Sequence, residues 1–198
     1  MDRKAREEQI RDELAAESDR GCTLVAASAL NVFLEEFIKV ALIPDPHAIK
    51  HAINPLFEQM GPLATFSAKI KLAYGLGLIT KTDFTDLEKI RRIRNIASHE
   101  HSAMTFETQS ILAINRTLEG ADLVVQHLPI RKERESKKLP ATTPKRGRRA
   151  SMERLRFVLS VASIAGSLDS KGKFFESDPL AREHMISLMR SLTLPRRV

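Results

Sequence analysis

The chain has 198 residues, a single cysteine and a formal net charge of +7, and this length suits one well-buried domain with an appendage. Because Cys22 has no disulfide partner and no signal sequence opens the chain, we expect a protein of the reducing cytoplasm. No run approaches the ~18 consecutive apolar residues that a membrane span needs, which excludes an integral membrane protein.

Apolar residues recur at intervals of three and four through most of the first 128 positions, and alternating runs bounded by hairpin turns are hard to find. This pattern predicts an all-α protein. We expect a bundle of about five helices in residues 1–129, a basic flexible linker in 130–150 and a C-terminal helical extension in 151–198.

The first expected helix is long and runs from about Arg3 to Leu42. Pro44 and Pro46 follow it and would end it, because proline cannot donate a backbone hydrogen bond. A short second helix is expected over 47–59, disturbed at Pro55 for the same reason.

The third and fourth helices are separated by a glycine-rich stop. The third is expected over 63–76, with an apolar stripe on one face and Lys69 pointing away from it. Thr80 or Thr82 can cap the fourth helix, which would begin near Asp83.

A fifth helix is expected over 106–127. The next segment is basic: residues 131–156 carry 11 basic and 3 acidic side chains, which leaves a net charge of −1 for the rest of the chain. A near-neutral body with one basic segment indicates an appended contact for polyanions. Helical spacing returns over 151–168, and 179–192 could form one more short helix.

The fourth helix carries the sequence Arg94-Asn95-Ile96-Ala97-Ser98-His99, a permanent cation close to a side chain that titrates near neutrality. An arginine can hold a phosphate while a histidine moves a proton. At ~100° per residue, however, Arg94 and His99 lie ~140° apart around the helix. The alternative is a structural ion pair of Arg94 with Glu17 or Asp19 and a solvated histidine.

Three stretches resemble the mannitol operon repressor (MtlR) family over about residues 17–128. They are Glu17-Ser18-Asp19-Arg20-Gly21-Cys22, His51-Ala52-Ile53-Asn54-Pro55-Leu56-Phe57, and Gly61-Pro62-Leu63 continued by Ser67-Ala68-Lys69-Ile70-Lys71-Leu72-Ala73-Tyr74-Gly75-Leu76-Gly77-Leu78-Ile79. The resemblance implies an all-helical bacterial transcription regulator.

Arg94 and His99 are also similar to the Arg-x4-6-His motif of HEPN helical domains, which is a metal-independent ribonuclease site in many members. By this resemblance Arg94 would bind the scissile phosphate, His99 would transfer a proton and Asn95 would orient them. Two such motifs commonly meet across a dimer in those relatives, which implies a homodimer.

The charges Glu17, Asp19 and Arg20 flank a glycine near an apolar helical run, where unpaired ions would be costly. We expect structural ion pairs there, with a subunit contact as the rival interpretation. Cys22 is expected to be a small buried residue and not a nucleophile. His99 has no second ligand cluster at suitable spacing, so no metal and no cofactor are expected.

The basic segment contains Pro144-Lys145-Arg146-Gly147-Arg148-Arg149, which looks like an AT-hook without the proline that usually follows its core. Extended basic side chains neutralise phosphates and release counterions, so Lys145, Arg146, Arg148 and Arg149 are candidates for weak DNA or RNA contact. A solvated linker without a ligand is the alternative.

These observations favour a cytoplasmic regulator of the mannitol repressor type. We expect it to act as a homodimer through a protein partner or weak nucleic-acid binding, without contact to a membrane. The alternative is a HEPN-like endoribonuclease of the toxin type that uses Arg94, Asn95 and His99.

Overall fold

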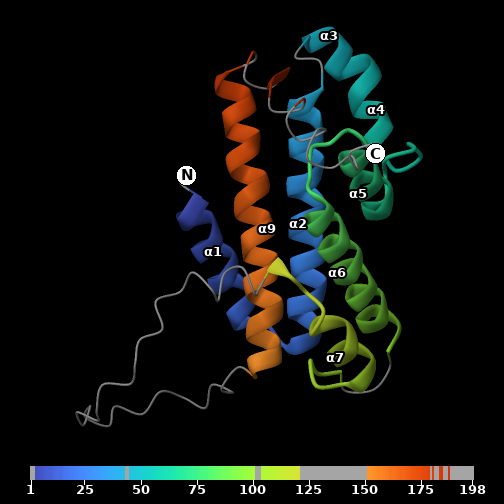
Figure 1. Ribbon diagram of the computed structural model, residues 1–198. Helices are drawn as coiled ribbons and strands as arrows, with labels where there is room; N and C mark the ends of the chain where they lie inside the picture. The colour runs from blue at the N-terminus through green and yellow to red at the C-terminus, as the bar shows by residue number, and fades with distance from the viewer. Residues whose placement is uncertain are drawn as a thin grey trace, which may run out of the picture.

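The structure is a computed structural model that describes residues 3–42, 45–100, 104–120 and 151–178 together with 180, 183, 184 and 187. All regular structure in these residues is helical, and no strand occurs among them, which confirms the all-α prediction (Figure 1). None of the described helices has a stretch long and apolar enough to cross a membrane.

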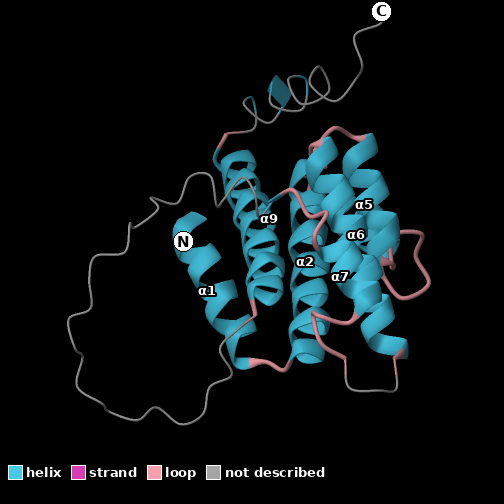
Figure 2. Ribbon diagram, turned by 60° about the horizontal axis from the view of Figure 1, so that its bottom comes forward, coloured by secondary structure: helices cyan, strands magenta, loops and turns pink. Residues whose placement is uncertain are grey.

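Two long helices form the centre of the bundle, α2 (Asp19–Ala41) and α9 (Met152–Ser177). α9 packs along both α2 and α1 (Arg3–Ala16), and it lies between them in both ribbon views (Figures 1 and 2). On its other side, α2 contacts α5 (Phe66–Gly75) and α6 (Lys81–His99). The first part of the segment expected to be a C-terminal extension therefore packs inside the bundle.

The core between these helices consists of aliphatic and aromatic side chains that recur at helical spacing. Its fully buried members include Leu30, Leu34 and Ile38 on α2, Ile90 and Ile93 on α6, and Phe157, Val161 and Ala165 on α9. Burying one large aliphatic or aromatic side chain contributes roughly 1.5–3 kcal/mol. α1 and α9 approach each other closely at Gly166, where a Cβ atom would lie 2.6 Å from Cγ of Glu7.

The expectation of one helix over 3–42 is wrong, because the chain breaks between α1 and α2. Ser18 has an extended backbone (φ −66°, ψ 166°), and its Oγ accepts a hydrogen bond from the amide of Gly21 at 3.0 Å. A serine that caps the next helix satisfies an amide that has no partner within the helix. Asp19 follows as an acidic residue in the first turn, where the helix dipole favours it.

The junction between α1 and α2 is stabilised by Arg154 of α9, which is only 9% exposed. Its guanidinium donates hydrogen bonds to the carbonyls of Leu14 (2.7 Å) and Glu17 (2.6 Å) and to Oδ1 of Asp19 (3.0 Å). Carbonyls at a helix C-terminus have no partner within their own helix, and a cation placed there satisfies them. One side chain therefore joins α1, α2 and α9.

The segment expected as a second helix over 47–59 is helical from Pro46 to Phe57, in three consecutive pieces. They are α3 (Pro46–Ala48), the π-helical η1 (Ile49–Ile53) and α4 (Asn54–Phe57). The amide of Asn54 bonds to the carbonyl of Ile49, five residues earlier. This wider turn lies directly before Pro55 and is the predicted disturbance.

α5 begins at Phe66, three residues later than expected, because Thr65 caps it and its Oγ1 accepts from the amide of Ala68 at 3.2 Å. α6 begins at Lys81, and the predicted cap at Thr80 is confirmed as a reciprocal capping box with Asp83. The prediction that Lys69 points away from the core is wrong, since Lys69 is buried with 2% exposure.

The helix expected over 106–127 is interrupted. α7 spans only Gln109–Asn115, and the chain then turns through residues 116–119. The carboxylate of Asp86 on α6 is 1% exposed and accepts from the amides of Glu119 (3.0 Å) and Gly120 (2.8 Å). The carboxylate of Asp86 thus accepts hydrogen bonds from amides that would bond within the helix if it were continuous. Residues 121–127 lie outside the described residues.

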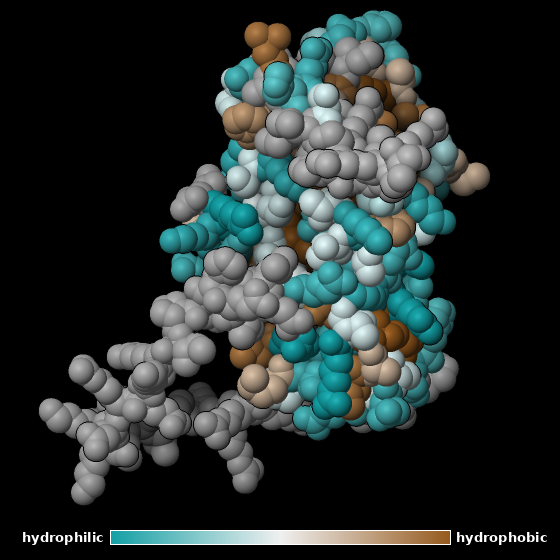
Figure 3. Space-filling view, viewed as in Figure 1, coloured by the Kyte–Doolittle hydropathy of each residue, from teal (hydrophilic) through white to brown (hydrophobic). Residues whose placement is uncertain are grey.

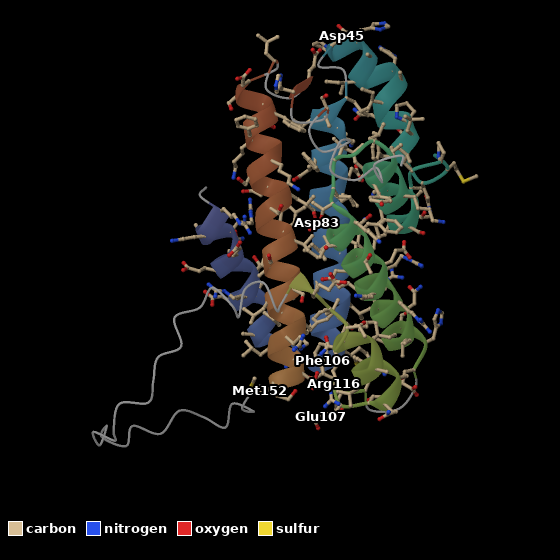
Figure 4. The ribbon with its side chains drawn as sticks, viewed as in Figure 1. Asp45, Asp83, Phe106, Glu107, Arg116 and Met152 are labelled. Atoms are coloured by element: carbon tan, nitrogen blue, oxygen red, sulfur yellow. The ribbon has the colours of Figure 1, made fainter. Side chains whose placement is uncertain are left out.

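α9 extends nine residues beyond the expected end at residue 168. The polar stretch after Leu168 suggests an end, but Phe175 packs on Phe37 of α2 with ring centroids 5.5 Å apart. α9 begins at the end of the bundle where Phe106 and Arg116 also lie (Figure 4). The expected linker 130–150 and most of 179–192 lie outside the described residues.

Cys22 is fully buried on α2, as expected for a packing residue. Burial raises the pKa of its thiol to about 12, although the nearby positive charge of Arg154 opposes the shift. A thiol that stays protonated at neutral pH is a poor nucleophile, so the structure gives Cys22 no catalytic character.

We predict that Arg154→Ala lowers the free energy of unfolding by about 3 kcal/mol, because it leaves Asp19 and the carbonyls at the end of α1 without their partner. The control is Arg116→Ala, which removes an exposed ion pair with Glu153 and should cost less than about 1 kcal/mol. Urea unfolding followed by circular dichroism measures both. Equal losses in the two variants would contradict the role given to Arg154.

Candidate functional site

A pocket of about 470 Å³ opens between α2, α5 and α6. Small side chains leave the space, because α2 presents Ala27 and Ser28 to it, and Ala64 just before α5 and Ser67 in its first turn line the opposite side. The complete lining is Leu24, Ala27, Ser28, Asn31, Ala64, Thr65, Phe66, Ser67, Arg91, Arg94 and Asn95. No carboxylate belongs to this lining, so the pocket is a positively charged concavity.

The two arginines of the pocket are three residues apart on α6 and so lie on one face of that helix. Arg91 is anchored by Glu88, with Nη2 to Oε2 at 2.7 Å and Nε to Oε2 at 3.1 Å. Arg94 is exposed, and its Nη1 donates to Oδ1 of the neighbouring Asn95 at 3.1 Å. Among the described residues, no carboxylate forms an ion pair with Arg94.

A cluster of charges around the buried Lys69 lies beside the pocket and links α5 to α2. Nζ of Lys69 donates to Oε2 of Glu35 at 2.6 Å and to Oδ1 of Asn31 at 3.0 Å, and Lys39 binds the other oxygen of Glu35 at 2.7 Å. Both ammonium groups also lie over the ring of Phe57, at 5.8 Å for Lys69 and 4.9 Å for Lys39.

The cluster changes the pKa of Glu35. Burial by itself raises this pKa, but the hydrogen bonds from Lys39 and Lys69 and their positive charges outweigh burial and lower it below its ordinary value of 4.5. A carboxyl group whose pKa is lowered on folding stabilises the protein above its ordinary pKa. This contribution is lost as the pH falls through the lowered pKa of the folded state.

A second concavity of about 780 Å³, the α6–α7 groove, lies along another side of α6. Its apolar residues are Phe84, Ile96, Ala113 and Ile114, and its charged residues are Glu88, Lys89, Arg91 and Arg92. Arg92 is exposed, and it has no carboxylate partner among the residues that the structure describes. In the space-filling view, hydrophobic side chains are visible between hydrophilic ones on the side of α6 and α7 (Figure 3).

The structure brings together only part of the predicted catalytic group. Arg94 and Asn95 line the pocket, whereas His99 is exposed at the last residue of α6 and does not line it. Within one chain this placement agrees with the angular divergence expected from the helix and does not support the ribonuclease alternative. No group of three potential metal ligands occurs in the described part of the chain.

The alternative ion pair of Arg94 with Glu17 or Asp19 is not formed either. Asp19 binds Arg154 instead, and its second oxygen accepts from the amide of Phe106 at 3.3 Å. Arg20 reaches the carbonyl of Glu100 at 2.6 Å. In the chain described here, Asp19 and Arg20 therefore make structural contacts.

The four candidate nucleic-acid ligands, Lys145, Arg146, Arg148 and Arg149, lie outside the described residues. Two other arginines of the basic segment are inside the bundle and serve its packing. Arg154 holds the α1–α2 break, and Arg156 donates to the carbonyl of Leu118 at 3.3 Å. Only the part of the basic segment before α9 is therefore left as a candidate for polyanion contact.

Most residues of the pocket carry no signal in the sequence that marks them as neighbours. Arg91 could have been found, since it stands three residues before Arg94. Asn31 and Lys69 carried no such signal, because the contact between them spans 38 positions and only packing of α5 on α2 creates it.

We predict that Lys69→Met lowers the free energy of unfolding at pH 7 by about 2 kcal/mol. Loss of one partner from a buried pair costs up to ~5 kcal/mol, but Glu35 keeps Lys39 and is 27% exposed. The deficit should shrink as the pH falls below 4.5 and through the lowered pKa of Glu35 in the folded protein, where the carboxylate loses its charge. Lys71→Met, at an exposed position of α5, is the control. Chemical unfolding at pH 7 and at pH 3 measures the deficit. A deficit that is the same at both values would contradict the ion pair of Lys69 with Glu35 as its cause.

Comparison with known proteins assigns the chain to a family. The model of the MtlR mannitol repressor family matches residues 6–169. Mannitol operon repressors from two strains of Escherichia coli are each 29% identical over 98 residues. That match covers 50% of this chain and spans about half the length of these curated relatives.

Two solved structures share the fold. The X-ray structure of the MtlR–HPr complex from Escherichia coli matches with a TM-score of 0.55 and 23% identity, over 86% of this chain and 98% of that chain. A possible transcriptional regulator, YggD from Shigella flexneri, matches with a TM-score of 0.55 and 15% identity, over 82% and 95% of the two chains. With the family model matching most of its length, this chain belongs to the MtlR mannitol repressor family.

Proposed function

We propose that this chain is a transcription regulator of the mannitol repressor type that works by binding another protein through α6. The observation that carries the proposal is the α6–α7 groove, which joins an apolar surface to the exposed guanidinium of Arg92, for which the described residues supply no carboxylate. Family membership supports the regulatory role, and the groove supports the mode of action.

The chemistry of the groove suits a protein partner. The centres of protein interfaces are enriched in apolar side chains and arginine, and an arginine can bind a carboxylate through two parallel hydrogen bonds. Ile96 and Ile114 are only partly buried against the core and supply the apolar surface. A partner that fits the groove would present an apolar side chain next to a carboxylate.

The proposed partner is a protein of the HPr type. The structurally similar Escherichia coli protein has been solved in a complex with HPr.

We predict that the full chain binds HPr and that Arg92→Glu weakens this binding about tenfold, because it puts a like charge against the carboxylate of the partner. Isothermal titration of the chain with HPr from Escherichia coli, and with HPr from its own bacterium, measures the affinity. The control is Lys81→Glu, the same charge change at an exposed position of α6 that does not line the groove.

The possible outcomes test separately whether HPr is the partner and whether the α6–α7 groove is its binding surface. If the wild-type chain binds neither HPr, the partner is wrong. If HPr binds with equal affinity to wild type, Arg92→Glu and Lys81→Glu, the partner stands and the α6–α7 groove is excluded as its site.

Weak nucleic-acid binding is the second part of the proposal and belongs to residues 131–150. This segment holds nine basic and two acidic side chains, among them Lys145, Arg146, Arg148 and Arg149. Binding that neutralises phosphates weakens steeply with salt, because each neutralised phosphate releases counterions.

We predict that replacing residues 131–150 by a Gly/Ser segment of equal length abolishes DNA binding and its salt dependence but leaves the fold intact. Fluorescence anisotropy with an A·T-rich duplex at several salt concentrations measures the binding, and circular dichroism checks the fold. A second variant changes only Lys145, Arg146, Arg148 and Arg149 to serine. Unchanged affinity in both variants would exclude this segment from DNA contact.

A further inference from the structure

The polar side chains that line the pocket between α2, α5 and α6 can all donate hydrogen bonds, and none of them is acidic. Arg94 contributes a full positive charge that is not neutralised by any described carboxylate. Arg91 adds a second guanidinium, which Glu88 anchors through only one of its carboxylate oxygens. Arg94 is exposed, so its guanidinium is free to bind an acceptor, and with Arg91 it gives the pocket a positive potential that favours an anion.

The two asparagines of the pocket strengthen this conclusion. Oδ1 of Asn31 accepts from the ammonium of Lys69, and Oδ1 of Asn95 accepts from the guanidinium of Arg94. With both amide oxygens bound to cations, the NH₂ groups of these side chains are what remains for a ligand. Both asparagines thus act as donors, which matches an acceptor-rich anion.

The start of α5 forms the facing wall. The Oγ1 atom of Thr65 accepts a hydrogen bond from the amide of Ala68, and the carbonyl of Thr65 accepts one from the amide of Lys69. The amides of α5 therefore have acceptors within the helix and its cap from the third residue onward. The first amides of a helix have no acceptor within it and carry the positive end of the helix dipole. Phe66 and Ser67 hold these positions and line the pocket, and Ser67 and Ser28 add hydroxyl groups.

The number of donors favours a phosphate over a carboxylate. Two guanidinium groups, two side-chain amides and three hydroxyls exceed what the two oxygens of one carboxylate can accept. A phosphate monoester offers three terminal oxygens and, near neutral pH, up to two negative charges. Leu24, Ala27 and Phe66 add apolar surface for an organic group, and about 470 Å³ falls within the range of small-molecule sites.

We propose that this pocket binds a small organic phosphate monoester, held by Arg91 and Arg94 of α6 against the first turn of α5. The pocket adjoins the α6–α7 groove at Arg91, which lines both, whereas Arg94 lines only the pocket and Arg92 lines only the groove. Substitutions at Arg94 and at Arg92 therefore test the phosphate site and the protein-binding groove separately.

The test is a titration of the full wild-type chain with glycerol 3-phosphate and with inorganic phosphate, followed by ¹H–¹⁵N NMR. Glycerol and acetate serve as the uncharged and the carboxylate reference. We expect saturable shifts at the amides of Phe66, Ser67 and Asn95 with the phosphates, tighter binding of the monoester than of inorganic phosphate, and weaker binding at higher salt.

Arg94→Gln should weaken the binding of glycerol 3-phosphate about tenfold, because it removes a charge-assisted contact but keeps an exposed polar side chain. Arg92→Gln is the matched control, with the same change two residues away on the same helix, and should bind like wild type. Both positions are exposed, so both variants are expected to fold, which their NMR spectra show directly.

Three results would overturn the proposal. The first is no saturable shift with either phosphate up to 10 mM, on the order of the weakest affinities of interest. The second is equal binding by wild type and Arg94→Gln. The third is acetate binding as tightly as glycerol 3-phosphate, which would make the site a carboxylate site. If Arg92→Glu binds HPr weakly but binds glycerol 3-phosphate like wild type, the protein and the phosphate bind at different sites.

Discussion

The guanidinium of Arg154 is the contact on which the order of the bundle depends. A buried cation must be fully partnered, and its acceptors come from the last carbonyls of α1 and from Asp19 at the start of α2. α9 is therefore fixed against both N-terminal helices at the point where the chain breaks. Arg154 also holds the position of Asp19, whose other oxygen binds the amide of Phe106. The segment that leads into α7 is thereby tied to the same junction.

A second buried cation plays the corresponding role on the other side of α2. Lys69 places the first turn of α5 beside Asn31 and Glu35, while the body of α5 packs on α6. The pocket exists because this pairing brings the start of α5 and the arginines of α6 to opposite sides of small residues on α2. The same helix α6 carries the α6–α7 groove on another side. One helix thus presents two surfaces of different chemistry, one suited to a small anion and one suited to a protein.

Local signals in the chain predicted several elements correctly. The threonine before α6 is followed three residues later by an aspartate, and this pair forms the capping box within four residues. The disturbance at Pro55 follows from a missing backbone donor, which needs no tertiary contact. The break at Ser18 was missed because the apolar spacing continues across it. Its reason lies in Arg154, which is 135 positions away from Asp19 and gives the end of α1 its hydrogen-bond partner.

By itself the sequence determined the helical class, the cap of α6 and the membership of the MtlR family, because these depend on spacing, on short-range hydrogen bonds and on matched residues. Tertiary structure alone decided which charges are buried and which face a ligand. Lys69 looked like a solvated lysine and is buried, whereas Arg94 lies with Arg91 and not with His99 in a pocket. The physical reason is that a long charged side chain is buried only where packing supplies its partners, and those partners stand on other helices.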